Sequence, residues 1–147
     1  EVLFQAKQYQ KEKQEGTLEK EDFQMEPWLP VLEKKIPLKT HAHRADDILT
    51  AIRIAKEFEI DLTLDHCTEG HLIAEEIAES GFPAIIGPDL TARSKIEVQN
   101  MSFKTNGILE KAGALTAIMT DHPVSLIRYL PLCAGLAVKQ GMSMEGH

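Results

Sequence analysis

The chain has 147 residues, of which 43% are apolar and 27% charged, a composition typical of a water-soluble globular domain. Its net charge of −7 and the lack of any cluster of Lys and Arg argue against a nucleic-acid-binding surface. No stretch approaches the ~18 consecutive apolar residues of a membrane span. Cys67 and Cys133 form no disulfide framework and favour a reducing compartment. We therefore expect a cytoplasmic protein without nucleic-acid or membrane partners.

The first 35 residues differ from the rest of the chain. Apolar residues recur at a weak helical spacing from Val2 to Tyr9, and a second short apolar group lies between Phe23 and Leu32. Residues 1–35 are therefore predicted to form an N-terminal helical segment. At the other end, residues 145–147 read Glu-Gly-His and resemble the start of an expression tag, so they are left out of the functional interpretation.

From Ile36 onward, short apolar runs alternate with segments of helical period. The predicted strands cover residues 36–41, 60–66, 83–87 and 114–121. The predicted helices cover residues 46–58, 69–81, 107–113 and 123–141. Successive strand–helix units predict an α/β fold with parallel strands. An open doubly wound sheet and half of an eight-stranded barrel both fit. Because no strand is followed by a glycine-rich phosphate-binding motif, the nucleotide-binding version has little support.

Polar residues that can bind metal stand at the predicted ends of three strands: His41, His66 and Asp121. In parallel α/β folds the carboxyl ends of the strands meet at one edge, where binding sites gather. Two imidazoles and a carboxylate form a plausible partial shell for a divalent ion, with zinc as the first candidate and iron or manganese as alternatives. A single histidine at a strand end is more often a hydrogen-bonding turn residue, but three such positions in one pattern are less easily dismissed.

The stretches "PLKTHAHRADDILTAIRIAKEF", "LTLDHCTEGH" and "AGALTAIMTDHPV" together resemble the second half of the metal-dependent amidohydrolase superfamily, near its imidazolonepropionase-related members. The resemblance covers about residues 30–144 and implies that residues 36–144 form half of a (β/α)₈ TIM barrel, its strands 5–8. It also implies that His41, His66 and Asp121 bind the metal, with Asp121 transferring protons and His66 assisting catalysis. Because residues two apart in a strand point to the same side, His43 could face the site together with His41, the preferred ligand. His43, His122 and Arg93 are predicted to contact substrate or orient the ligands.

By this resemblance the protein is expected to hydrolyse a C–N bond of a cyclic amide or peptide-like small molecule with metal-activated water. The H-x-H motif that opens the family's metal site is absent from the sequence, so the chain is expected to be a fragment with little activity of its own. The alternative is a catalytically silent half-barrel that only self-associates. A half-barrel has two unpaired edges and an uncovered apolar interior face. In either case we therefore expect a homo-oligomer that covers those edges.

Overall fold

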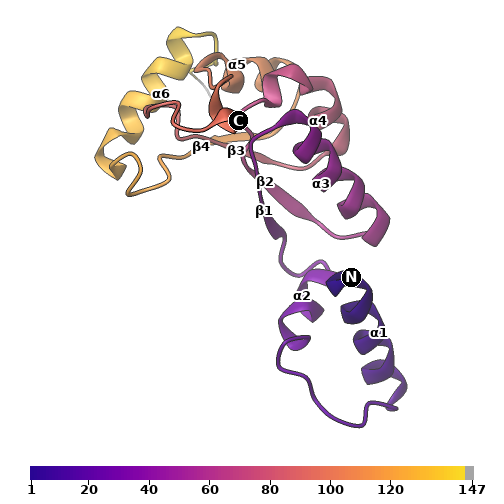
Figure 1. The fold of residues 1–147 in the computed structure, drawn as a ribbon. Coiled ribbons are helices and arrows are strands. Elements are labelled where there is room, and N and C mark those ends of the chain that lie inside the picture. The colour runs from indigo at the N-terminus through magenta and orange to yellow at the C-terminus, as the bar shows by residue number, and fades with distance from the viewer. Residues whose placement is uncertain (145–147) are drawn as a thin grey trace.

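The computed structural model describes residues 1–144, and the predicted tag residues 145–147 lie outside the described part (Figure 1). The chain folds into strands that alternate with helices after a helical start. The elements in chain order are α1 (Val2–Glu15), η1 (Glu26–Trp28), α2 (Leu29–Leu32), β1 (Leu38–Ala42), α3 (Ala45–Phe58), β2 (Leu62–His66), η2 (Gly70–Leu72), α4 (Ala74–Ser80), β3 (Ala84–Ile86), η3 (Ile96–Val98), α5 (Lys104–Lys111), β4 (Thr116–Ile118), η4 (Ile127–Tyr129) and α6 (Leu130–Lys139). No helix within residues 1–144 is long and apolar enough to cross a membrane.

The four strands form one parallel sheet in the order β1-β2-β3-β4. Each strand therefore pairs with the next one along the chain, and β1 and β4 stand at the two edges. This arrangement confirms the predicted α/β class with successive parallel units. It also favours the half-barrel over the doubly wound sheet, because a doubly wound sheet reverses its strand order at a switch point.

The core lies between one face of the sheet and the helices. Leu62 and Leu64 of β2 alternate with the half-buried Thr63 and Asp65, and the leucines pack in one cluster with buried apolar residues of α3. The opposite face, which we expected to be apolar, carries polar groups on β1 and β2. The Nζ of Lys39 lies 2.7 Å from Oδ2 of Asp65, and the Thr63 hydroxyl donates to Oδ1 of Asp65 at 3.0 Å.

The N-terminal part of the chain contains α1, η1 and α2, which lie beyond the start of β1 (Figure 1). The ring of Phe4 on α1 packs edge-on against Phe58 at the end of α3, with ring centroids 4.8 Å apart. Glu26 accepts hydrogen bonds from Tyr9 and Lys13, which ties η1 to α1. This helical segment thus lies at the end of the sheet opposite the carboxyl ends of the strands.

Two predicted helices begin later than expected. The helix predicted over 69–81 starts at Ala74, because a 3₁₀ turn at Gly70–Leu72 comes first. The helix predicted over 123–141 starts at Leu130, where Pro131 fits the first turn. The preceding stretch is held instead by Ser125, whose N–H donates to the Thr120 carbonyl and whose hydroxyl donates to the Leu90 carbonyl.

Candidate metal centre

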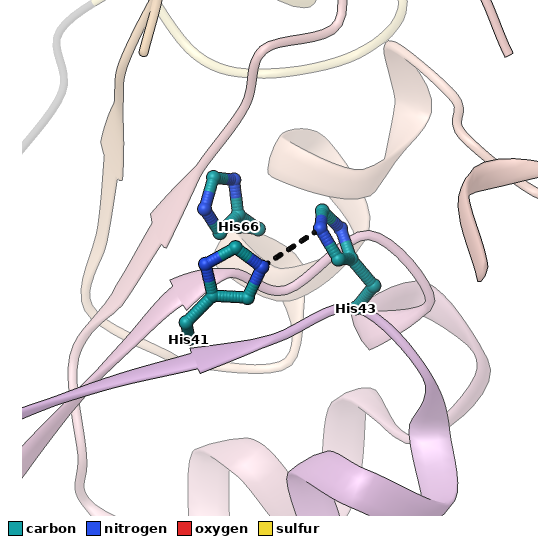
Figure 2. Close-up of side chains that lie close together, drawn as sticks. All are labelled: His41, His43 and His66. Atoms are coloured by element: carbon teal, nitrogen blue, oxygen red, sulfur yellow. Dashed lines mark hydrogen bonds between the residues drawn. The ribbon is translucent and has the colours of Figure 1, made fainter. Parts of the chain in front are cut away.

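Three histidines gather where β1 and β2 end: His41, His43 and His66 (Figure 2). Their potential ligand atoms all lie within 4.8 Å of one another. The Nε2 atoms of His41 and His43 are 3.1 Å apart, and the ring centroids of His41 and His66 are 4.1 Å apart. Because three imidazoles meet at this distance, the cluster can hold a metal ion.

His66 reaches the cluster through an unusual backbone conformation. Strand alternation alone would point His66 to the same side as Leu62 and Leu64, toward the helices. The backbone of His66 is left-handed, with φ 72°, and this rotates its Cβ away from that side. The ring instead lies against His41, which stands on the other face of the neighbouring strand. Cys67 is also left-handed, with φ 48°, so the chain turns sharply here.

The hydrogen bonds of His66 fix which of its nitrogens can bind an ion. Its Nδ1 lies 2.8 Å from the carbonyl oxygen of Gly87. A carbonyl can only accept, so Nδ1 carries the proton and Nε2 keeps its lone pair. This pairing of a ring N–H with a backbone carbonyl is the usual support of a metal-binding histidine. His66 is 7% exposed, so the support is buried.

His43 lies one residue beyond β1, in the pocket wall. Its Nδ1 is 2.8 Å from the hydroxyl of Thr68, and its Nε2 is 3.9 Å from Oε1 of Glu97. Burial, followed by the neighbouring imidazoles of His66 and His41, lowers the pKa of His43 from its ordinary value of 6.5, while Glu97 raises it. A neutral ring is therefore favoured near pH 7, and only a neutral imidazole can bind a metal.

Asp121 shares a cavity of about 200 Å³ with the three histidines. It follows β4 by three residues and has a left-handed backbone, with φ 49°. Its carboxylate is outside the three-histidine cluster but lines the same space, as do Ser94 and Lys95 from the loop after β3. A proton acceptor, a cation and three imidazoles therefore face one small volume.

The remaining predicted site residues lie elsewhere. His122 is exposed beside Asp121 and does not line this cavity. Arg93 donates to the carbonyl of Met101 at 2.8 Å and lines a separate depression with Asp89 and Lys104. Thr68, Gly87 and Glu97 contact the histidines but were not singled out from the sequence, because each does so across a long stretch of chain with no motif to mark it.

Comparison with known proteins supports the same interpretation. Neither a protein-family model nor a curated protein matches the chain. A solved structure described as an amidohydrolase from Thermotoga maritima MSB8 matches with a TM-score of 0.91 and 41% sequence identity over 99% of this chain. The chain matches a fragment of an amidohydrolase. It spans 39% of the length of that solved amidohydrolase chain, and its four parallel strands match part of an amidohydrolase TIM barrel. The family resemblance found in the sequence is thereby confirmed.

Proposed function

We propose that the chain carries part of the active site of a metal-dependent hydrolase that cleaves the C–N bond of a cyclic amide or peptide-like small molecule. The single observation that carries this proposal is the three-histidine cluster at the strand ends of an amidohydrolase fold. The similar solved structure is described as an amidohydrolase, and this is why the C–N class is favoured.

The donor set fits a divalent ion, with zinc as our first choice and iron or manganese as alternatives. His66 offers a lone pair on Nε2, and the Nε2 atoms of His41 and His43 lie 3.1 Å apart, close to the spacing of two ligands on one ion. A divalent ion supplies Lewis acidity, lowering the pKa of a water molecule and polarising a carbonyl group.

The chain's own residues would then orient the substrate and move the proton. In our proposal the Asp121 carboxylate takes a proton from water and delivers it to the leaving nitrogen, because it faces the same cavity as the histidines. Lys95 lines that cavity from the loop after β3. Its ammonium lies 3.3 Å from Oε1 of Glu97, and in our proposal it attracts a carboxylate or a carbonyl oxygen of the substrate. A cavity of about 200 Å³ suits a small molecule rather than a long peptide.

The proposal is tested with the 147-residue chain loaded with Zn²⁺, Mn²⁺ or Fe²⁺ and assayed on cyclic amides and dipeptides. We expect slow release of product that depends on the metal. Asp121→Asn should lower kcat by about 10²–10⁴-fold, the usual contribution of a proton-transferring group, while metal content is unchanged. Glu79→Gln, which alters an exposed carboxylate on α4, is the control. Turnover that persists in Asp121→Asn would contradict the role of Asp121, and turnover without metal would contradict the reaction class.

A second candidate function, assembly without catalysis, is favoured by the two sheet edges. Beside the unpaired edge of β1 a groove of about 360 Å³ is lined by apolar residues such as Leu38, Ala51 and Ile54 together with polar ones, His41 and His43 included. Past the other edge, Leu115, Ile127 and Leu132 are 60%, 58% and 49% exposed. Because all four strands are parallel and in chain order, a second copy can place its β4 beside β1 in the same direction. Two such contacts close an eight-stranded ring.

We therefore infer that the 147-residue chain forms a homo-oligomer through these edges. Sedimentation velocity at micromolar concentration is expected to give a dimer, and Leu132→Asp should dissociate it because a charge would enter the apolar contact. Leu72→Asp, at a residue of η2 that is 58% exposed and lies in the loop after β2, which is not an edge strand, should leave it intact. A stable monomer would contradict the homo-oligomer. Equal dissociation in both variants would show that the sheet edges are not its interface.

A further inference from the structure

Thr68 and Glu69 are polar residues that are buried directly after β2, with 7% and 8% of their surface exposed. The left-handed turn at His66 and Cys67 brings them beside the end of β1. There the N–H of Cys67 donates to the Ala42 carbonyl and the N–H of Glu69 to the His43 carbonyl, each at 2.9 Å. The loop after β2 is thus bonded along the backbone to the loop after β1.

The carboxylate of Glu69 bonds the far end of the loop after β1, where α3 begins. Its Oε2 accepts the N–H of Ala45, the first residue of α3, at 2.9 Å, and its Oε1 accepts Nδ2 of Asn100 at 2.7 Å. The residue before α3, Arg44, gives no side-chain cap, so Glu69 supplies one from a neighbouring strand. A buried carboxylate is costly unless it is hydrogen-bonded, and a helix N-terminus favours negative charge. The Glu69 carboxylate accepts two hydrogen bonds and lies at the N-terminus of α3, so its charge is stabilised in both ways.

Between these two anchors stands His43, whose backbone is outside the strand ladder because β1 ends at Ala42. The Glu69 N–H holds its carbonyl, and the Thr68 hydroxyl lies 2.8 Å from its Nδ1. With Nδ1 engaged in this way, Nε2 is the atom that faces Nε2 of His41 at 3.1 Å. The contacts of residues 68 and 69 therefore determine where the His43 ring points.

We propose that Thr68 and Glu69 are positioning residues for His43. Nε2 must keep its lone pair to bind an ion, so Nδ1 carries the proton and the Thr68 hydroxyl accepts it, while Glu69 fixes the backbone of residues 43–45. The inference rests on the proposed function only in taking a metal ion as the occupant of that cluster. A helix cap without this role would stabilise α3 but would leave the tautomer and the metal affinity of His43 unchanged.

The first test is independent of metal. The ring nitrogens of the full chain are followed by ¹⁵N NMR at about pH 8, where unperturbed histidines are neutral. We expect His43 of the metal-free wild type to carry its proton on Nδ1. Thr68→Val, which keeps the shape but removes the hydroxyl, should move the proton to Nε2, and Thr68→Ser should restore Nδ1–H. Glu69→Gln should populate both tautomers of His43. The carboxylate accepts from the Ala45 N–H and from the Asn100 amide, and the single oxygen of Gln leaves one of these donors without its acceptor.

The second test is the affinity for Co²⁺, a spectroscopic substitute for zinc. Thr68→Val and Glu69→Gln should each weaken binding by about 10- to 100-fold, as loss of an outer hydrogen bond does in metal sites, with Thr68→Ser near wild type. Ile52→Val is the control, because Ile52 is an apolar core residue of α3 outside the hydrogen bonds that hold His43, so its truncation should lower stability alone. It should keep both the tautomer and the affinity.

The outcomes separate this inference from the function on which it rests. A wild-type His43 with its proton on Nε2, or a Thr68→Val ring that keeps Nδ1–H, would overturn the positioning role. So would Co²⁺ affinity in Thr68→Val equal to that of the wild type. If the tautomers change as expected while the wild type binds no metal, the positioning role stands and the proposed metal-dependent function fails.

Discussion

His41→Ala and His66→Ala are each expected to lower the affinity of the chain for Zn²⁺ or Co²⁺ by about 100-fold or more. Each removes one of three imidazoles, and a histidine ligand accounts for a large share of the free energy of metal binding. The two variants differ in how they affect the fold. His41 is exposed at a regular strand position, whereas His66 is buried and bonded to the Gly87 carbonyl, so removing its ring also removes packing and leaves that carbonyl without its donor.

Metal affinity is measured by competition with a chromophoric chelator, and folding is followed by thermal unfolding of the metal-free protein. His41→Ala should lose affinity with its unfolding temperature nearly unchanged, while His66→Ala should lose both. His71→Ala is the matched control, because His71 lies on η2 and bonds Thr105 at 3.0 Å, outside the cluster. Equal affinities in wild type and His41→Ala would mean that the cluster is not the metal site.

The order of elements could be predicted because it depends on local patterns. Apolar runs separated by amphipathic segments are a property of neighbouring residues, and parallel pairing of successive strands follows from chain connectivity. Helix starts were less predictable. The sequence around Gly70–Leu72 has helical character, yet the backbone there forms a 3₁₀ turn that packs against α5, a segment more than thirty residues away. Only long-range packing decides between the two conformations.

The site was predictable in part for a similar reason. His41 and His66 could be chosen because strand ends converge. The argument from two-residue spacing also allowed His43 to face the site, and the structure brings it within 3.1 Å of His41. What the spacing could not supply is the left-handed backbone at His66, because simple alternation places that ring among the helices. Nor could it indicate Gly87, whose carbonyl orients His66 from 21 residues away.

The polar face of the sheet also escaped prediction. Lys39 and Asp65 were unremarkable as single charged residues in strands, and an apolar interior was the simpler expectation. Their ion pair arises because Lys39 pairs with Thr63 and His41 with Asp65 in the β1–β2 register, so the two charges lie on one face. Register is a property of two segments together, and it cannot be read from either alone.

Gly87→Ala is expected to destabilise the folded protein strongly, although it adds only one methyl group. Gly87 follows β3 with φ 136°, a region that residues with a side chain rarely adopt. A Cβ at this position would overlap the carbonyl oxygen of Met119, on the segment paired with β3. Strain and overlap together should lower the free energy of unfolding by about 3–5 kcal/mol, measured by urea denaturation.

Gly135→Ala provides the matched control, because Gly135 lies inside α6 with no atom near the position of an added Cβ. There the same methyl group should raise the free energy of unfolding by about 0.5–1 kcal/mol, the difference in helix propensity. Gly87→Ala should also weaken metal binding more than a destabilised core variant such as Ile52→Val, because shifting the Gly87 carbonyl removes the acceptor that keeps the His66 proton on Nδ1. A Gly87→Ala protein with wild-type metal affinity would show that His66 is oriented without that carbonyl.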